Sequence, residues 1–93
     1  MLTKQEHDEI VQLVKNYYND SVFDYDDKKQ FVRLNDHIGF GQNMLIYRGD
    51  SGKYIIVIQD IDFDEDNLYI KFETFNHLKQ KLNQIFLQRE DLI

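Results

Sequence analysis

The chain has 93 residues, a formal net charge of −6 and no cysteine. Its length predicts a single domain over residues 1–93 with one modest core. The missing cysteines exclude disulfides, thiol catalysis and cysteine-ligated zinc. The negative charge argues against nucleic acid or an anionic membrane as a direct partner. No window approaches the ~18 apolar residues of a membrane span, and the first ten residues lack a signal-peptide pattern, so we expect a cytoplasmic protein.

An amphipathic helix is predicted over residues 3–19. Thr3 caps its amino end, and Glu6 three positions later completes a capping box. Residues 20–30 are polar and acidic, so we expect a long loop there. The apolar stripe of the helix consists of Ile10, Leu13, Val14, Tyr17 and Tyr18.

Strand patterns dominate the middle of the chain. Residues 31–35 fit a short edge strand. Residues 43–48 and 54–63 are predicted strands, joined by the hairpin turn Gly49-Asp50-Ser51-Gly52. A further strand is predicted over residues 68–74.

A closing amphipathic helix is predicted over residues 75–90, with Thr74 as its cap. The fold class is therefore α+β, in the order α-β-β-β-α. Its sheet is an antiparallel meander of three strands, or of four if residues 31–35 join. We expect both helices on one sheet face; a three-layer arrangement is the alternative. The apolar face of the closing helix consists of Phe75, Leu78, Leu82, Ile85 and Phe86.

Register predictions divide the apolar residues between two sheet faces. A four-residue turn sets Ile46 opposite Ile55, and a tip at 65–66 sets Ile61 opposite Ile70 and Asp60 opposite Lys71. The buried face is then led by Val57, Ile61, Ile70 and Phe72. The reverse face is too apolar for a solvated surface, so we expect it to bind a partner. That patch consists of Leu45, Tyr47, Tyr54, Ile56 and Ile58.

Carboxylates crowd the end of the second predicted hairpin. The spacing resembles the opening of a calcium loop, but the sixth position is Glu65 instead of Gly and the twelfth is Lys71 instead of Glu. We therefore expect no metal and no cofactor, and interpret the acidic run as a solvated turn or as a patch that contacts a partner. The carboxylates are Asp60, Asp62, Asp64, Glu65 and Asp66.

No catalytic residues are expected. His7, His37 and His77 lack the spacing of metal ligands or of a catalytic base. The string 49–53 matches neither the serine-protease sequence nor a phosphate-binding loop. Frequent Ile, Lys and Asn and the absence of Ala and Pro indicate a low-GC genome, such as that of a bacterium or phage.

We therefore expect a non-enzymatic acidic module that binds a protein. A phage or mobile-element inhibitor, or an immunity protein, would act on a basic or nucleic-acid-processing partner. The alternatives are a small metal-dependent hydrolase that uses the acidic hairpin 60–66, and a structural homodimer subunit.

Overall fold

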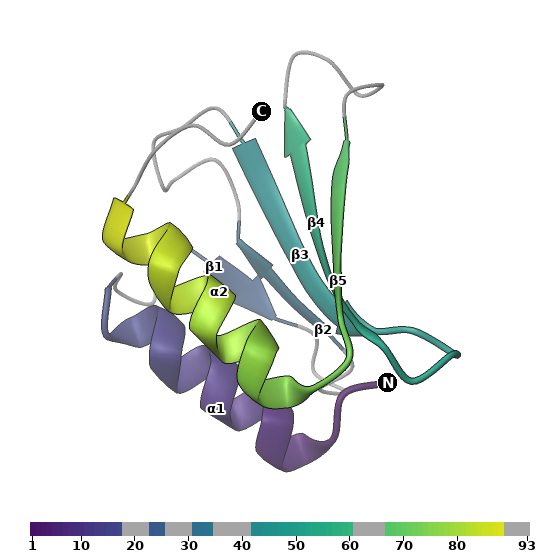
Figure 1. The fold of residues 1–93 in the computed structure, drawn as a ribbon. Helices are drawn as coiled ribbons and strands as arrows, with labels where there is room; N and C mark the ends of the chain where they lie inside the picture. The colour runs from purple at the N-terminus through teal and green to yellow at the C-terminus, as the bar shows by residue number, and fades with distance from the viewer. Residues whose placement is uncertain (18–22, 26–30, 35–41, 61–66, 89–93) are drawn as a thin grey trace.

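The computed structural model describes residues 1–17, 23–25, 31–34, 42–60 and 67–88 (Figure 1). It has the predicted α+β class with an antiparallel meander. Among these residues, no helix is both long and apolar enough to cross a membrane. The elements are α1 (Lys4–Lys15), β1 (Phe23–Tyr25), β2 (Phe31–Leu34), β3 (Gln42–Arg48), β4 (Tyr54–Asp60), β5 (Leu68–Phe72) and α2 (Phe75–Gln88).

The molecule has two layers. The sheet has the order β1-β2-β3-β4-β5, and each strand is antiparallel to its neighbours. The helices α1 and α2 lie side by side on one face of this sheet (Figure 1). The preferred two-layer arrangement is thus confirmed, and no described helix lies on the other face.

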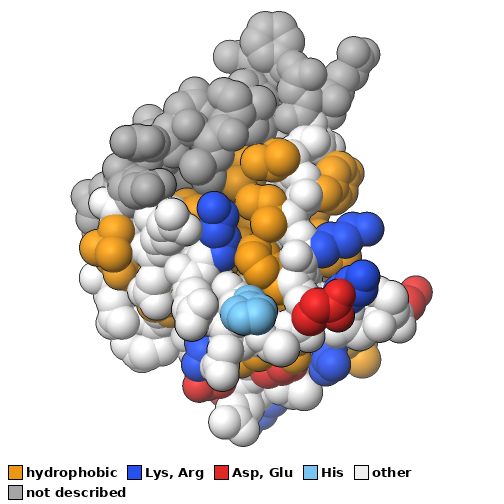
Figure 2. Space-filling model, viewed as in Figure 1, with side chains coloured by type: hydrophobic (Ala, Val, Ile, Leu, Met, Phe, Trp, Pro, Cys, Tyr) orange, Lys and Arg blue, Asp and Glu red, His pale blue; other side chains and the backbone are white. Residues whose placement is uncertain are grey.

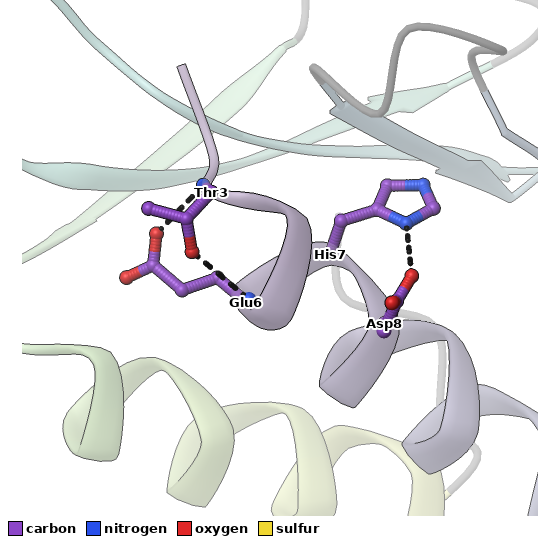
Figure 3. Close-up of polar contacts among 4 residues, drawn as sticks. All are labelled: Thr3, Glu6, His7 and Asp8. Atoms are coloured by element: carbon purple, nitrogen blue, oxygen red, sulfur yellow. Dashed lines mark hydrogen bonds and ion pairs between the residues drawn. The ribbon is translucent and has the colours of Figure 1, made fainter.

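The first turn of α1 has the predicted capping box (Figure 3). The Glu6 backbone N–H donates to the Thr3 hydroxyl at 3.1 Å, and the Thr3 backbone N–H donates to a Glu6 carboxylate oxygen at 2.9 Å. Two otherwise unpaired N–H groups at the helix start are satisfied in this way. The neighbouring His7 is buried, and its Nδ1 lies 3.3 Å from Oδ1 of Asp8.

Both helices bury the faces that their spacing predicts. Within the stripe of α1, Ile10 and Val14 are fully buried and Leu13 packs against the core; Tyr18 lies outside the described residues. At the start of α2 the backbone N–H of His77 donates to the Thr74 hydroxyl at 3.2 Å. The buried residues of α2 are Leu78, Leu82, Ile85 and Phe86.

Two predictions about the strands were wrong. The predicted loop over 20–30 contains β1, whose three residues pair with β2. Strand β2 pairs with β1 on one side and β3 on the other, so it lies inside the sheet and not at its edge. A strand of three residues is too short for alternation to be recognised in the sequence.

The β3–β4 register differs from the prediction by one residue. Ile46 pairs with Ile56 instead of Ile55. Lys53 belongs to the turn, because the Gly49 N–H donates to the Lys53 carbonyl at 2.9 Å. A one-residue slip moves every side chain of a strand to the other face.

The β4–β5 register is also displaced. Ile70 pairs with Ile56 instead of Ile61, a difference of five residues (61 − 56), and Lys71 pairs with Ile55 instead of Asp60. An odd shift again exchanges the two faces. Val57 therefore lies on the face without helices, contrary to the prediction, while Ile61 lies outside the described residues.

Candidate functional site: the open face of the sheet

The sheet face without a described helix is called the open face from here on. Because side chains alternate along a strand, the observed pairings assign one set of residues from β2 to β5 to this face. Its members are Phe31, Arg33, Asn43, Leu45, Tyr47, Ile55, Val57, Gln59, Tyr69 and Lys71.

A groove of about 490 Å³ runs along the open face. Val57 lies at its floor, since it is only 4% exposed, whereas Tyr69 directly opposite it on β5 is 56% exposed. Leu45 pairs with Val57 from the other side, on β3. The lining residues are Met1, Phe31, Arg33, Leu45, Tyr47, Arg48, Val57, Gln59 and Tyr69.

The groove floor is separate from the core under the helices. Ile55 and Val57 are buried, but neither belongs to the cluster that the helices cover. Larger neighbours on the adjacent strands surround these β-branched side chains. The molecule therefore has a second apolar region, on the side away from the helices.

Positive charge lies along the groove. Among the described residues that line it, the charged side chains are Arg33 and Arg48. The Arg48 Nε–H donates to the Gly52 carbonyl at 2.9 Å, and the guanidinium lies 4.8 Å from the centre of the Tyr54 ring. The amino terminus of Met1 donates to the Arg48 carbonyl at 3.1 Å. The Met1 amino group therefore contacts the Arg48 backbone at one end of the groove, while the Arg48 guanidinium packs on Tyr54 toward the helix side of the sheet.

The structure divides the predicted apolar patch between the two faces. Leu45 and Tyr47 lie on the open face. Tyr54, Ile56 and Ile58 are buried in the core beneath the helices, because the register differs by one residue. The prediction that these five side chains form one surface was therefore wrong.

Sequence reasoning missed Phe31, Val57 and Tyr69 as groove residues. The alternation within each strand was visible, but it does not say which residues of neighbouring strands share a face. Assigning Lys53 to the turn would have placed Leu45, Tyr47 and Val57 together.

The acidic residues are only partly described. Asp60 pairs with Gln42 at the end of the β3–β4 ladder, and its side chain is not described. Within the described ranges, no three His, Asp or Glu side chains are grouped so that they could hold a metal ion. The other predicted acidic site residues, Asp62, Asp64, Glu65 and Asp66, lie outside the described residues.

Tyr54 connects the sheet to α1. Its hydroxyl donates a hydrogen bond to the Glu6 carboxylate. Burial opposes ionisation of Glu6, but the hydrogen bonds from the Thr3 backbone and the Tyr54 hydroxyl, together with the Arg48 charge, lower its pKa overall. Burial, the bond to Glu6 and the Glu6 charge raise the pKa of Tyr54. These shifts reflect a structural contact on the helix side of the sheet.

Comparison with protein-family models, curated proteins and solved structures finds no match. Any functional conclusion therefore depends on the residues of this chain. Fold and surface together define a small two-layer α+β protein with an apolar groove, lined by Arg33, on its open sheet face.

Proposed function

We propose that this chain is a non-enzymatic protein-binding module and that the open face is its docking surface. The observation that supports this most strongly is the groove, with Val57 at its floor and the exposed Tyr69 beside it. Monomeric proteins rarely leave large contiguous apolar patches uncovered. Tyrosines such as Tyr47 and Tyr69 combine an apolar ring with a polar tip, and such residues are enriched at protein interfaces.

The charges favour a partner that is basic overall and offers a carboxylate at the contact. The net charge of −6 attracts a positively charged protein from a distance and raises the association rate. Arg33 lies on the open face and lines the groove, and it needs an acidic group opposite it once the partner displaces water. A nucleic-acid-processing enzyme is the class of basic partner that we propose, with this module as its inhibitor or immunity protein.

The test compares variants that change one surface each. Tagged wild-type chain is used to capture binding proteins. The affinity of each purified candidate is then measured for the wild type and for the variants Tyr69→Ser, Arg33→Glu and Leu87→Ser. Leu87 lies on α2 and is 72% exposed, so it is a matched control for losing an exposed apolar side chain. An aromatic anchor contributes ~2 kcal/mol, so Tyr69→Ser should weaken binding about 30-fold.

Arg33→Glu should also weaken binding, and Leu87→Ser should leave it unchanged. A partner that binds all three variants as well as wild type would exclude the open face as the docking surface. A labelled single-stranded oligonucleotide serves as the second probe, because aromatic and basic side chains on a sheet can also stack on bases. If the wild type binds that probe tightly and Tyr69→Ser does not, the partner is a nucleic acid and not a protein.

A further inference from the structure

Strand β5 forms one edge of the sheet. It pairs with β4 on one side, and no strand of the described chain lies on its other side (Figure 1). Its first two residues are exposed apolar side chains, with Leu68 39% and Tyr69 56% exposed. The edge therefore presents both apolar surface and backbone groups that no other described strand pairs with.

This edge has little protection against pairing with another strand. Soluble proteins commonly place charged residues, proline or bulges on an edge strand. Strand β5 contains one charged residue, Lys71, and the chain contains no proline. Its pairing with β4 continues without interruption from Leu68 to Phe72. A straight edge of this kind is a template for another strand.

The helix side of β5 is entirely apolar. Leu68, Ile70 and Phe72 alternate toward this side, yet Leu68 is exposed and the other two are only half-buried. In Figure 2, hydrophobic side chains remain visible between α2 and the β5 side of the sheet. The two helices therefore leave an apolar strip at this edge uncovered.

We propose that β5 pairs antiparallel with β5 of a second copy of this chain, with Ile70 on the twofold axis. In this register Leu68 faces Phe72 of the partner subunit, and Ile70 faces Ile70 of the partner subunit. The uncovered strips then form one continuous apolar surface on the helix side. The two sheets join into one, which removes the β5 edge of each copy.

The opposite side of β5 fits the same register. Tyr69 faces Lys71 of the partner subunit, and the twofold axis repeats this pair. An ammonium group beside a tyrosine ring is a favourable contact. No two like charges stand opposite each other, because the single cation of the strand lies one residue from the axis. Strand β5 is therefore complementary to itself in apolar character, and its charges do not oppose the pairing.

A charge exchange tests this register. Tyr69→Lys places a lysine opposite Lys71 of the partner subunit at two positions, so the dimer should dissociate about tenfold more readily or worse. Adding Lys71→Glu to the same chain restores opposite charges across the axis, and dimerisation should return. Leu87→Lys and Arg33→Glu are the controls on α2 and on the open face away from β5, and neither should change the dissociation constant. Analytical ultracentrifugation over a concentration series measures each constant, and circular dichroism verifies folding.

Backbone amide exchange provides an independent measurement. The β5 amides that point away from β4 should become protected as wild-type chain is concentrated, and should stay unprotected in Tyr69→Lys. A wild type that remains monomeric at the highest soluble concentration would overturn the proposal. So would a dimer that resists Tyr69→Lys, that the double variant fails to restore, or that Arg33→Glu or Leu87→Lys disrupts. If Arg33→Glu loses partner binding but still forms the dimer, the two interfaces are distinct. Dimerisation through β5 and docking on the open face can then be tested, and can fail, independently.

Discussion

The hydroxyl of Tyr54 on β4 donates a hydrogen bond to the carboxylate of Glu6 in the first turn of α1. The same carboxylate accepts the backbone N–H of Thr3. The Glu6 side chain therefore caps the helix and connects it to β4 of the sheet. Since the Tyr54 ring is buried, the contact also fixes the position of α1 against the core.

Acidification should weaken this contact. The pKa of Glu6 is lowered in the fold, so its contribution to stability is complete above the unfolded value near 4.5 and is lost as pH falls through the folded value. Glu6→Gln should lower the melting temperature at neutral pH, and the difference from wild type should shrink as pH falls below 4.5. Thermal unfolding followed by circular dichroism across this range measures the difference.

The control for this pH dependence is Glu73→Gln. Glu73 is exposed, and its partner Lys53 at 3.3 Å is also exposed, so this pair should contribute little. A Glu6→Gln curve that runs parallel to the wild-type curve would contradict a role for the Glu6 charge.

We expect Tyr54 to contribute to the stability of the fold and not to partner binding. Tyr54→Ser removes a buried ring, and comparable truncations of large aromatic residues cost about 3–5 kcal/mol. Tyr54→Phe keeps the ring and removes only the bond to Glu6, at about 1 kcal/mol. Urea unfolding measures both free energies. A Tyr54→Ser variant that unfolds like wild type would place this ring outside the core.

Local signals predicted the helices, while the pairing of the strands needed tertiary information. Thr3 and Glu6 are three residues apart, so the capping box is readable from the sequence alone. The faces of β4 depend on whether Lys53 belongs to the turn or to the strand, and both readings keep the alternation intact. For this reason the groove around Val57 could not be predicted, although the sequence did predict the strands β3, β4 and β5 that form it.

Two adjacent residues of β3 provide a direct test of the observed faces. Ile46 is fully buried under the helices, while Leu45 is half-buried on the open face. Ile46→Ser leaves a cavity and buries a hydroxyl, so it should cost about 3–5 kcal/mol. Leu45→Ser should cost about 1 kcal/mol or less. Denaturant unfolding of the two variants measures the difference. The observed and the predicted register both place Ile46 under the helices and Leu45 on the opposite face, so the β4 pair Ile56→Ser and Val57→Ser is the one that distinguishes them.

The β3–β4 turn offers a second matched pair. Gly52 has a φ of +89°, a region that costs an L-residue about 1–2 kcal/mol, so Gly52→Ala should destabilise by that amount. Gly49 has no positive φ, and an added Cβ would lie 3.2 Å from Cδ1 of Ile55, the end of a side chain that can move. Gly49→Ala should therefore change the free energy of unfolding by ~0.5 kcal/mol or less. Equal losses in the two variants would show that crowding, and not backbone conformation, limits this turn.

The acidic segment 60–66 should be dispensable for folding. Five carboxylates within seven residues repel one another, and each exposed neighbouring pair costs a few tenths of a kcal/mol. Replacing Asp62, Asp64 and Asp66 with Asn should therefore leave the melting temperature unchanged or slightly raised in a chelating buffer.

Calorimetric titration of the wild type with Mg²⁺, Mn²⁺ and Ca²⁺ completes this test. Hard cations take oxygen ligands, so a metal-dependent hydrolase that uses this segment would release or absorb heat on binding, and the triple Asn variant would not. We expect no binding of any of the three ions to either protein. Heat of binding that disappears in the variant would favour the hydrolase over the non-enzymatic module, because a module that docks through the open face has no need of a metal.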